Sequence, residues 1–166
     1  MRIVDYDRGL AVEYAREWVF RRNPAYYNFE KIGGDCTNFA SQCLFAGIGV
    51  MNYTREVGWY YKSEFDRAAA WTGVQYFYNF LTANVIGVGD GAGPFAQEVG
   101  LAEVEAGDFL QFGRETGDFY HTPVVVGFWN GVPLLAAHSN DAFERPLTSY
   151  RYERLRCLHI LGGRIL

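Results

Sequence analysis

The sequence predicts an α+β domain in which helices come first and a small antiparallel sheet follows. Apolar residues recur at helical spacing in the first half of the chain, whereas the second half holds short apolar segments bounded by Gly, Pro or Asn. Helices that precede the strands, instead of alternating with them, favour an antiparallel sheet. Because the chain has 166 residues and neither an internal repeat nor a linker-like segment, we expect residues 1–166 to form a single domain.

Three helices are predicted in the N-terminal half: Asp7–Arg22, Cys36–Ala46 and Val74–Leu81. Asp7 can cap the first helix, because its carboxylate accepts a hydrogen bond from an unpaired backbone N–H group. Pro24 ends that helix, since the residue before proline avoids helical angles. Gly33 and Gly34 precede the second helix and allow the chain to turn sharply. A glycine-rich loop, Gly87 to Gly93, separates the helices from the strands.

The strand-like segments are Asp108–Gly113, Thr122–Trp129, Pro133–Ser139 and Leu155–Leu161. Asn130-Gly131, between the second and third of them, is typical of a two-residue hairpin turn. We therefore expect these two segments to pair as an antiparallel hairpin. Pro123 has no N–H group to donate, so its strand should begin irregularly or lie at an edge of the sheet.

The composition is that of a globular protein and argues against several function classes. Hydrophobic residues make up 49% of the chain and charged residues 20%, and the formal net charge is −4. This balance offers no basic surface for nucleic acid or an anionic membrane. The sequence contains neither an apolar run of transmembrane length nor a secretory signal at its start. We expect a protein that works in the cytosol, leaves by lysis or a specialised route, or is cut from a longer secreted chain.

Cys36 is the first candidate for chemistry. Three cysteines are an odd number, so at least one thiol is free. Cys36 falls at the predicted start of a helix, where free N–H groups and the positive end of the helix dipole favour the reactive thiolate. On local context alone, the alternative that Cys36 packs as a small core residue stays open. Cys43 and Cys157 lie in apolar stripes and are predicted to be core residues.

Histidine is the usual base for a thiol nucleophile, and the chain has three histidines. His121 opens one strand of the predicted hairpin and His138 ends the other, so both should lie at the same edge of the sheet. Asn140 lies just beyond His138. His159 alternates with Cys157 in the last strand and is predicted to be a hydrogen-bonded sheet residue.

Neither a metal nor an organic cofactor is expected. The sequence has no C-x-x-C pair and no H-x-x-x-H or H-E-x-x-H spacing, the patterns that are typical of zinc sites. No Gly-Lys-Ser/Thr follows the glycine-rich loop, so it does not have the pattern of a Walker phosphate-binding loop.

The segment GGDCTNFASQCLFAGI, preceded by YAREWVFRRNPAYYNF and followed by WYY, resembles the amidase domain of bacterial cell-wall-associated proteins. Later segments, AGDFLQF, HTPVVVGF and AAHSND, resemble the strands of that family, and the likeness runs from about Tyr6 to Ile160. That family belongs to the papain-like superfamily, alongside NlpC-type peptidases and CHAP domains. The resemblance therefore implies a papain-like fold, with N-terminal helices packed on the sheet, and hydrolysis of amide bonds by a cysteine.

The same resemblance implies a role for each candidate residue. Cys36 is implied as the nucleophile and His121 as the general base. His138 is implied as the third member, which orients His121, with Asn140 as the alternative. The Cys36 N–H group would hold the oxyanion, helped by a donor from Asp35 or from a tyrosine of the loop before it.

Peptidoglycan is the substrate that the resemblance implies, either in its peptides or at the amide between muramic acid and alanine. Tyr27, Trp59 and Trp71 are expected to line a groove for an extended glycopeptide, and core packing is the alternative for them. Two other functions stay open: a non-catalytic module that binds cell walls through its aromatic residues, and an effector or toxin that cleaves a protein amide.

Overall fold

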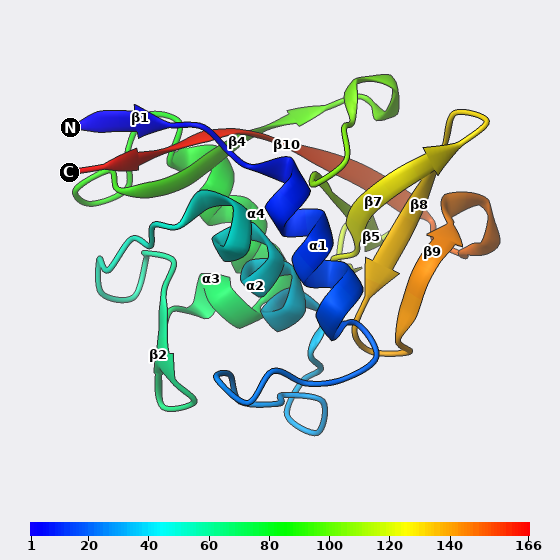
Figure 1. The fold of residues 1–166 in the computed structure, drawn as a ribbon, viewed down its shortest axis with the longest axis horizontal. Helices are drawn as coiled ribbons and strands as arrows, with labels where there is room; N and C mark the ends of the chain where they lie inside the picture. The colour runs from blue at the N-terminus through cyan, green and yellow to red at the C-terminus, as the bar shows by residue number, and fades with distance from the viewer.

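A computed structural model describes residues 1–166 and has the predicted α+β architecture of helices and an antiparallel sheet (Figure 1). Its elements, in chain order, are β1 (Arg2–Val4), α1 (Arg8–Trp18), α2 (Cys36–Ile48), β2 (Tyr61–Ser63), β3 (Asp66–Arg67), α3 (Ala69–Thr72), α4 (Val74–Ala83), β4 (Gly93–Val99), β5 (Phe109–Gly113), β6 (Phe119–His121), β7 (Val124–Trp129), β8 (Val132–Ala137), β9 (Ala142–Pro146) and β10 (Arg154–Ile165). Short 3-10 turns lie at Leu101–Glu103 and Leu147–Ser149. None of the helices combines the length and the apolar character that crossing a membrane requires.

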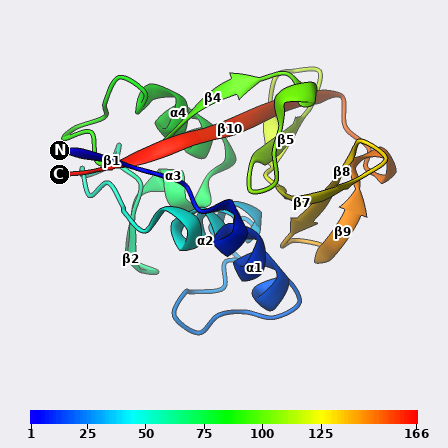
Figure 2. The ribbon, with the colours of Figure 1, turned by 45° about the horizontal axis from the view of Figure 1, so that its top comes forward.

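The main sheet is antiparallel and has the strand order β1-β10-β5-β7-β8-β9, with β4 also paired to β10 and β6 to β5. Strand β10 is 12 residues long and pairs with β1, β4 and β5, so it forms the spine of the sheet. Its pairing with β1 brings the two ends of the chain side by side, as Figures 1 and 2 show.

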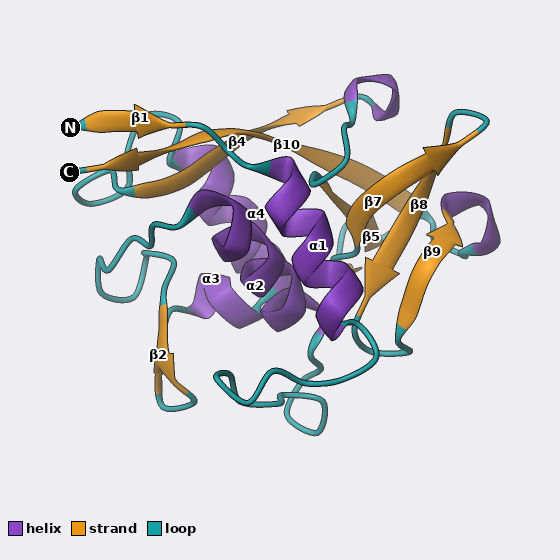
Figure 3. Ribbon diagram, in the orientation of Figure 1, coloured by secondary structure: helices purple, strands orange, loops and turns teal.

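The helices gather in the middle of the molecule, and the curved sheet wraps around them (Figure 3). A cluster of 22 buried residues fills the space between them and includes Phe39 of α2, Val124 of β7 and Ala136 of β8. A smaller cluster of seven buried residues covers the other face of the sheet and includes Phe112 of β5 and Leu135 of β8. Because side chains alternate along a strand, neighbouring residues of one strand belong to different clusters.

The predicted helices are present, with small differences at their ends. Asp7 caps α1 as expected, and its carboxylate accepts a hydrogen bond from the Leu10 N–H group at 3.0 Å. Helix α1 ends at Trp18, earlier than predicted. Helix α2 begins at Cys36, as predicted, and runs on to Ile48. Gly49 then stops it in a left-handed conformation, with φ of 72°, which glycine adopts without strain.

The predicted hairpin forms between β7 and β8. Asn130 and Gly131 both have positive φ, 49° and 78°, as the tight turn between twisted strands requires. Strand β6 ends at His121 and β7 begins at Val124, so the chain leaves the sheet around Pro123, which confirms the expected irregularity. The four predicted strands are therefore present, and the structure adds β1, β2, β3, β4, β6 and β9.

Candidate active site

Cys36 lies at the junction of α2 and the sheet and is nearly buried, with 8% of its surface exposed. The Thr37 hydroxyl lies 3.8 Å from its sulfur, and the backbone of Thr37 and Thr122 is close enough to lower the pKa of the thiol. Thr37 follows Cys36 in the helix, whereas Thr122 belongs to the segment that joins β6 to β7. The thiol is thus held between two parts of the chain that are far apart in sequence.

Burial raises the pKa of the Cys36 thiol, because a thiolate loses its hydration in the interior. The hydrogen bonds from Thr122 and Thr37 oppose this effect without cancelling it. The expectation that the start of a helix favours the Cys36 thiolate is therefore not met in the free protein, where burial has the largest effect on the pKa. At neutral pH the sulfur keeps its proton, and a reaction there requires a base.

The segment that carries His121 is fastened directly to α2. The hydroxyl oxygens of Thr37 and Thr122 lie 3.1 Å apart, and the buried Gln111 amide donates to the Thr122 hydroxyl at 3.2 Å. These contacts hold Thr122 beside the first turn of α2. His121, the preceding residue, is therefore close in the fold to the helix start that carries Cys36.

The His121 ring packs beside aromatic residues, with ring centroids 5.8 Å from Phe112 and 6.4 Å from Tyr150. Burial, together with the charge of the nearby Arg145 guanidinium, lowers the pKa of His121 to about 4. His121 is therefore neutral at pH 7 and able to accept a proton. No hydrogen bond joins its ring to Cys36 in the structure; such bonds often tighten only once substrate is bound.

The low pKa of His121 predicts a loss of stability in mild acid. Between pH 6.5, the ordinary pKa of histidine, and about pH 4, His121 is protonated in the unfolded chain but still neutral in the folded protein. The free energy of unfolding therefore falls as the pH falls through this range. Lowering the pH from 7 to 4.5 should cost about 2–3 kcal/mol through this residue. Urea unfolding of wild type and His121→Asn at both pH values measures it, and equal losses in the two proteins would contradict the shift.

His138 is buried and does not contact His121, so the predicted pairing of the two histidines is wrong. Its Nδ1 lies 2.6 Å from Asp35 Oδ2, and its Nε2 donates to the Trp18 carbonyl oxygen at 3.0 Å. The ring stacks on Phe39 at 4.0 Å, in the cluster between helices and sheet. His121 pairs across the sheet with Phe112, which belongs to the opposite cluster. The two histidines lie near one edge, as expected, but on opposite faces.

Asp35, directly before Cys36, is fully buried and anchors the start of α2. Its Oδ1 accepts hydrogen bonds from the Phe29 N–H group at 2.8 Å and the Asn38 amide at 2.9 Å. Its backbone N–H group donates to the Ser139 hydroxyl at 3.1 Å. Asp35 therefore cannot supply the predicted oxyanion donor, because its carboxylate only accepts and its N–H is already used. Its hydrogen bonds instead fix the backbone at the start of α2, directly before Cys36.

A cleft of about 310 Å³ opens beside His121. Its walls are Phe112, Tyr120, His121, Ser139, Asn140, Arg145, Tyr150 and Arg151. Asn140, the predicted supporting residue, lines the same cleft as His121. Ser139 connects this cleft to Cys36, because its hydroxyl accepts the Asp35 N–H and keeps its own hydrogen for a ligand.

Two of the three residues that were expected to bind substrate belong to the core. Trp59 and Trp71 are fully buried, with ring centroids 4.7 Å apart, so they cannot touch a substrate. Their indole N–H groups donate to Ser41 and Asn38 of α2. Tyr27 is 37% exposed and remains available at the surface.

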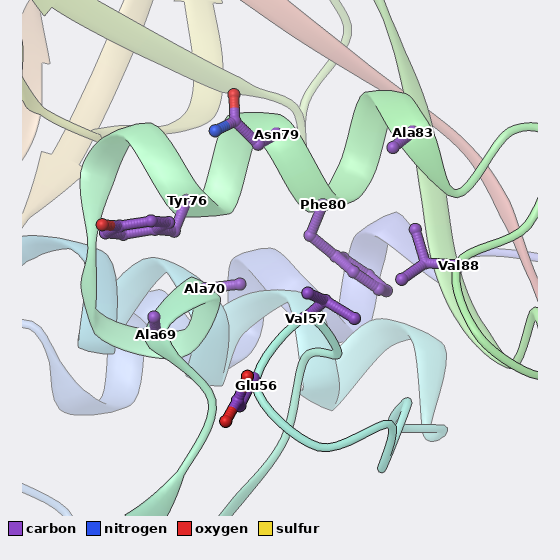
Figure 4. Close-up of a pocket in the computed structure, with 9 residues that line it drawn as sticks. All are labelled: Glu56, Val57, Ala69, Ala70, Tyr76, Asn79, Phe80, Ala83 and Val88. Atoms are coloured by element: carbon purple, nitrogen blue, oxygen red, sulfur yellow. The ribbon is translucent and has the colours of Figure 1, made fainter.

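A second cavity, of about 300 Å³, lies between α3, α4 and the loop around Val57 (Figure 4). Seven of its nine lining residues are hydrophobic, among them Phe80 and Val88. It contains neither a cysteine nor a histidine, so the chemistry is assigned to the cleft beside His121.

The remaining cysteines and histidine behave as predicted. Cys43 and Cys157 are buried in the two hydrophobic clusters. His159 is hydrogen-bonded within the sheet, with its Nδ1 2.8 Å from the buried Asp108 carboxylate. No group of three or more His, Cys, Asp or Glu side chains is arranged to hold a metal ion.

Sequence reasoning did not find Thr122, Ser139 or Arg145. The only sequence signal for Thr122 is its place next to His121. Arg145 carries no local signal, because it reaches the cleft only through the fold of β9 and the turn after it.

The fold and the site define an α+β protein in which a buried cysteine at a helix start meets a strand segment that carries a histidine. The chain belongs to the family described as "Putative amidase domain", whose model matches residues 5–161.

One bacterial protein is similar to this chain over most of the chain's length. The chain is 35% identical over 144 residues to "Uncharacterized protein YhbB" of Bacillus subtilis (strain 168). The alignment covers 85% of this chain and 44% of YhbB, so the chain spans less than half of that relative's length. No solved structure matches the chain.

Proposed function

We propose that the chain is a cysteine-dependent amide hydrolase of the papain-like type, and that it cleaves peptidoglycan. One observation carries the cysteine mechanism: the hydroxyl of Thr122, the residue after His121, lies 3.1 Å from the hydroxyl of Thr37, the residue after Cys36. That contact unites a potential nucleophile and a potential base that are far apart in sequence. The likeness to cell-wall amidase domains supports peptidoglycan as the substrate.

In the proposed reaction, neutral His121 removes the proton from the Cys36 thiol as the sulfur attacks the amide carbon. The C–N bond then breaks, and His121 returns the proton to the leaving amine. Water cleaves the resulting thioester with His121 again as base, which restores the thiol. Both groups are neutral in the free protein, because the thiol pKa is raised and the imidazole pKa is lowered, and these shifts oppose proton transfer before the sulfur attacks.

The oxyanion of the tetrahedral intermediate needs preorganised donors. The Cys36 N–H group is one, because the first N–H groups of a helix have no partner within it. The Ser139 hydroxyl is proposed as the second, since it borders both the cleft and the residue before Cys36. Asn140, which shares the cleft with His121, takes the place of His138 as the proposed orienting residue.

The reaction is tested by incubating the purified chain with purified bacterial cell walls and identifying the released fragments by mass spectrometry. The expected result is new fragments whose masses show addition of water across an amide bond, because hydrolysis adds one water for each bond broken. Fragments cleaved in the sugar chain, or binding to walls without release, would contradict the proposal. Binding without cleavage would favour the non-catalytic module.

A further inference from the structure

The cleft beside His121 carries positive charge that no protein carboxylate neutralises. Arg145 and Arg151 both line it, and none of its lining residues is acidic. Neither arginine forms an ion pair with an acidic side chain. The neighbouring Asp141 carboxylate is engaged by Arg22, at 2.9 Å. A cleft with two guanidinium groups and no counter-ion is suited to an anionic ligand.

Arg145 is held in place for such a ligand. Its guanidinium carbon lies 3.8 Å above the centre of the Tyr150 ring. Its Nε donates to the Ser149 hydroxyl at 2.9 Å, and one terminal nitrogen donates to the Ser149 carbonyl oxygen at 3.0 Å. The two bonds to Ser149 use two of the five guanidinium N–H groups. A rigid guanidinium with free N–H groups binds a carboxylate at low entropic cost.

Arg145 is also close to the proposed base. Tyr150 lies between them, with its ring centroid 6.4 Å from that of His121. The charge of Arg145 is felt at the His121 ring, whose pKa it helps to lower. At neutral pH His121 is uncharged, so the attraction for an anion comes from the two arginines.

We infer that the amide substrate of this cleft carries a free carboxylate near the bond that is cleaved, and that Arg145 binds that carboxylate. The inference rests on the proposed function, because it names the substrate class of the same site. Arg145 is a specificity-determining residue in this arrangement, and Arg151 adds long-range attraction from the exposed rim.

The test measures binding without catalysis, in the Cys36→Ala background. The probes are acetyl-Ala-Glu-Ala-amide and acetyl-Ala-Gln-Ala-amide, which differ by a single carboxylate, and the readout is the NMR signal of the His121 ring. The glutamate peptide should bind about fivefold more tightly, as one partly shielded ion pair allows. The preference should shrink as salt is added.

Variants connect the preference to Arg145. Arg145→Gln should abolish it, and Arg145→Lys, which keeps the charge, should restore part of it. Arg55→Gln removes one exposed positive charge elsewhere and should leave the preference unchanged. Circular dichroism is the check that each variant is folded. If Arg145→Gln does not fold, Arg145→Lys still tests the role of Arg145.

Equal affinity for the two peptides, no change at His121, or a preference that survives Arg145→Gln would overturn the inference. Loss of cell-wall hydrolysis by itself would not, because the peptides are tested on a variant without the nucleophile. The two proposals can therefore fail separately: hydrolysis without a carboxylate preference refutes only the inference, and a preference without hydrolysis refutes only the enzyme.

Discussion

Replacing Cys36 with alanine is expected to lower kcat for amide hydrolysis by at least about a thousandfold, while the protein stays folded. No other thiol can take its place, because Cys43 and Cys157 are buried in hydrophobic clusters. Cys36→Ser should lose nearly as much activity, since a hydroxyl gives up its proton far less readily than a thiol. Initial rates on cell walls, with circular dichroism as a check on folding, measure the effect.

Cys43→Ala is the matched control for this experiment. Cys43 lies on the same helix and is fully buried, so its replacement should cost about 1–2 kcal/mol of stability and leave the activity intact. If Cys36→Ala retained full activity, or if Cys43→Ala lost it, the assignment of Cys36 as nucleophile would be wrong.

Replacing His138 with alanine is expected to lower the free energy of unfolding by about 3–5 kcal/mol. The change removes the partner of the buried Asp35 carboxylate, 2.6 Å away, and opens a gap against Phe39. Arg22 lies 3.6 Å from the same carboxylate and compensates only in part. Because Asp35 precedes Cys36, the start of α2 should loosen as well. Urea unfolding at pH 7 measures the loss.

His159→Ala is the control for that experiment. His159 also pairs with a buried carboxylate, Asp108, but its side chain is 19% exposed and Asp108 keeps its ion pair with Arg8 at 2.8 Å. Its replacement should cost about 1–2 kcal/mol. A His138→Ala variant that kept its stability but lost activity would instead support the catalytic role that the sequence implies.

Much of the fold could be predicted because its signals are local. Asp7 caps α1 by accepting a hydrogen bond from Leu10, three residues later. Asn130-Gly131 closes a hairpin, and Gly33-Gly34 precede the helix that begins at Cys36. Strand β4 was harder to predict, because its sequence, GPFAQEV, contains proline and glycine and owes its strand conformation to pairing with β10. Pairing with β4 and β1 extends β10 to Ile165, beyond the predicted Leu161.

The sequence by itself determined that Cys36 starts a helix, that Cys43 and Cys157 are buried, and that Asn130-Gly131 joins two paired strands. Only the tertiary structure decided which face each histidine occupies, that Trp59 and Trp71 are core residues, and that burial raises the pKa of Cys36. The physical reason is the range of the interactions. Caps and turns depend on residues a few positions apart. His138, in contrast, is oriented by Asp35, which is 103 residues away in the sequence, and it is buried by elements that only folding brings together.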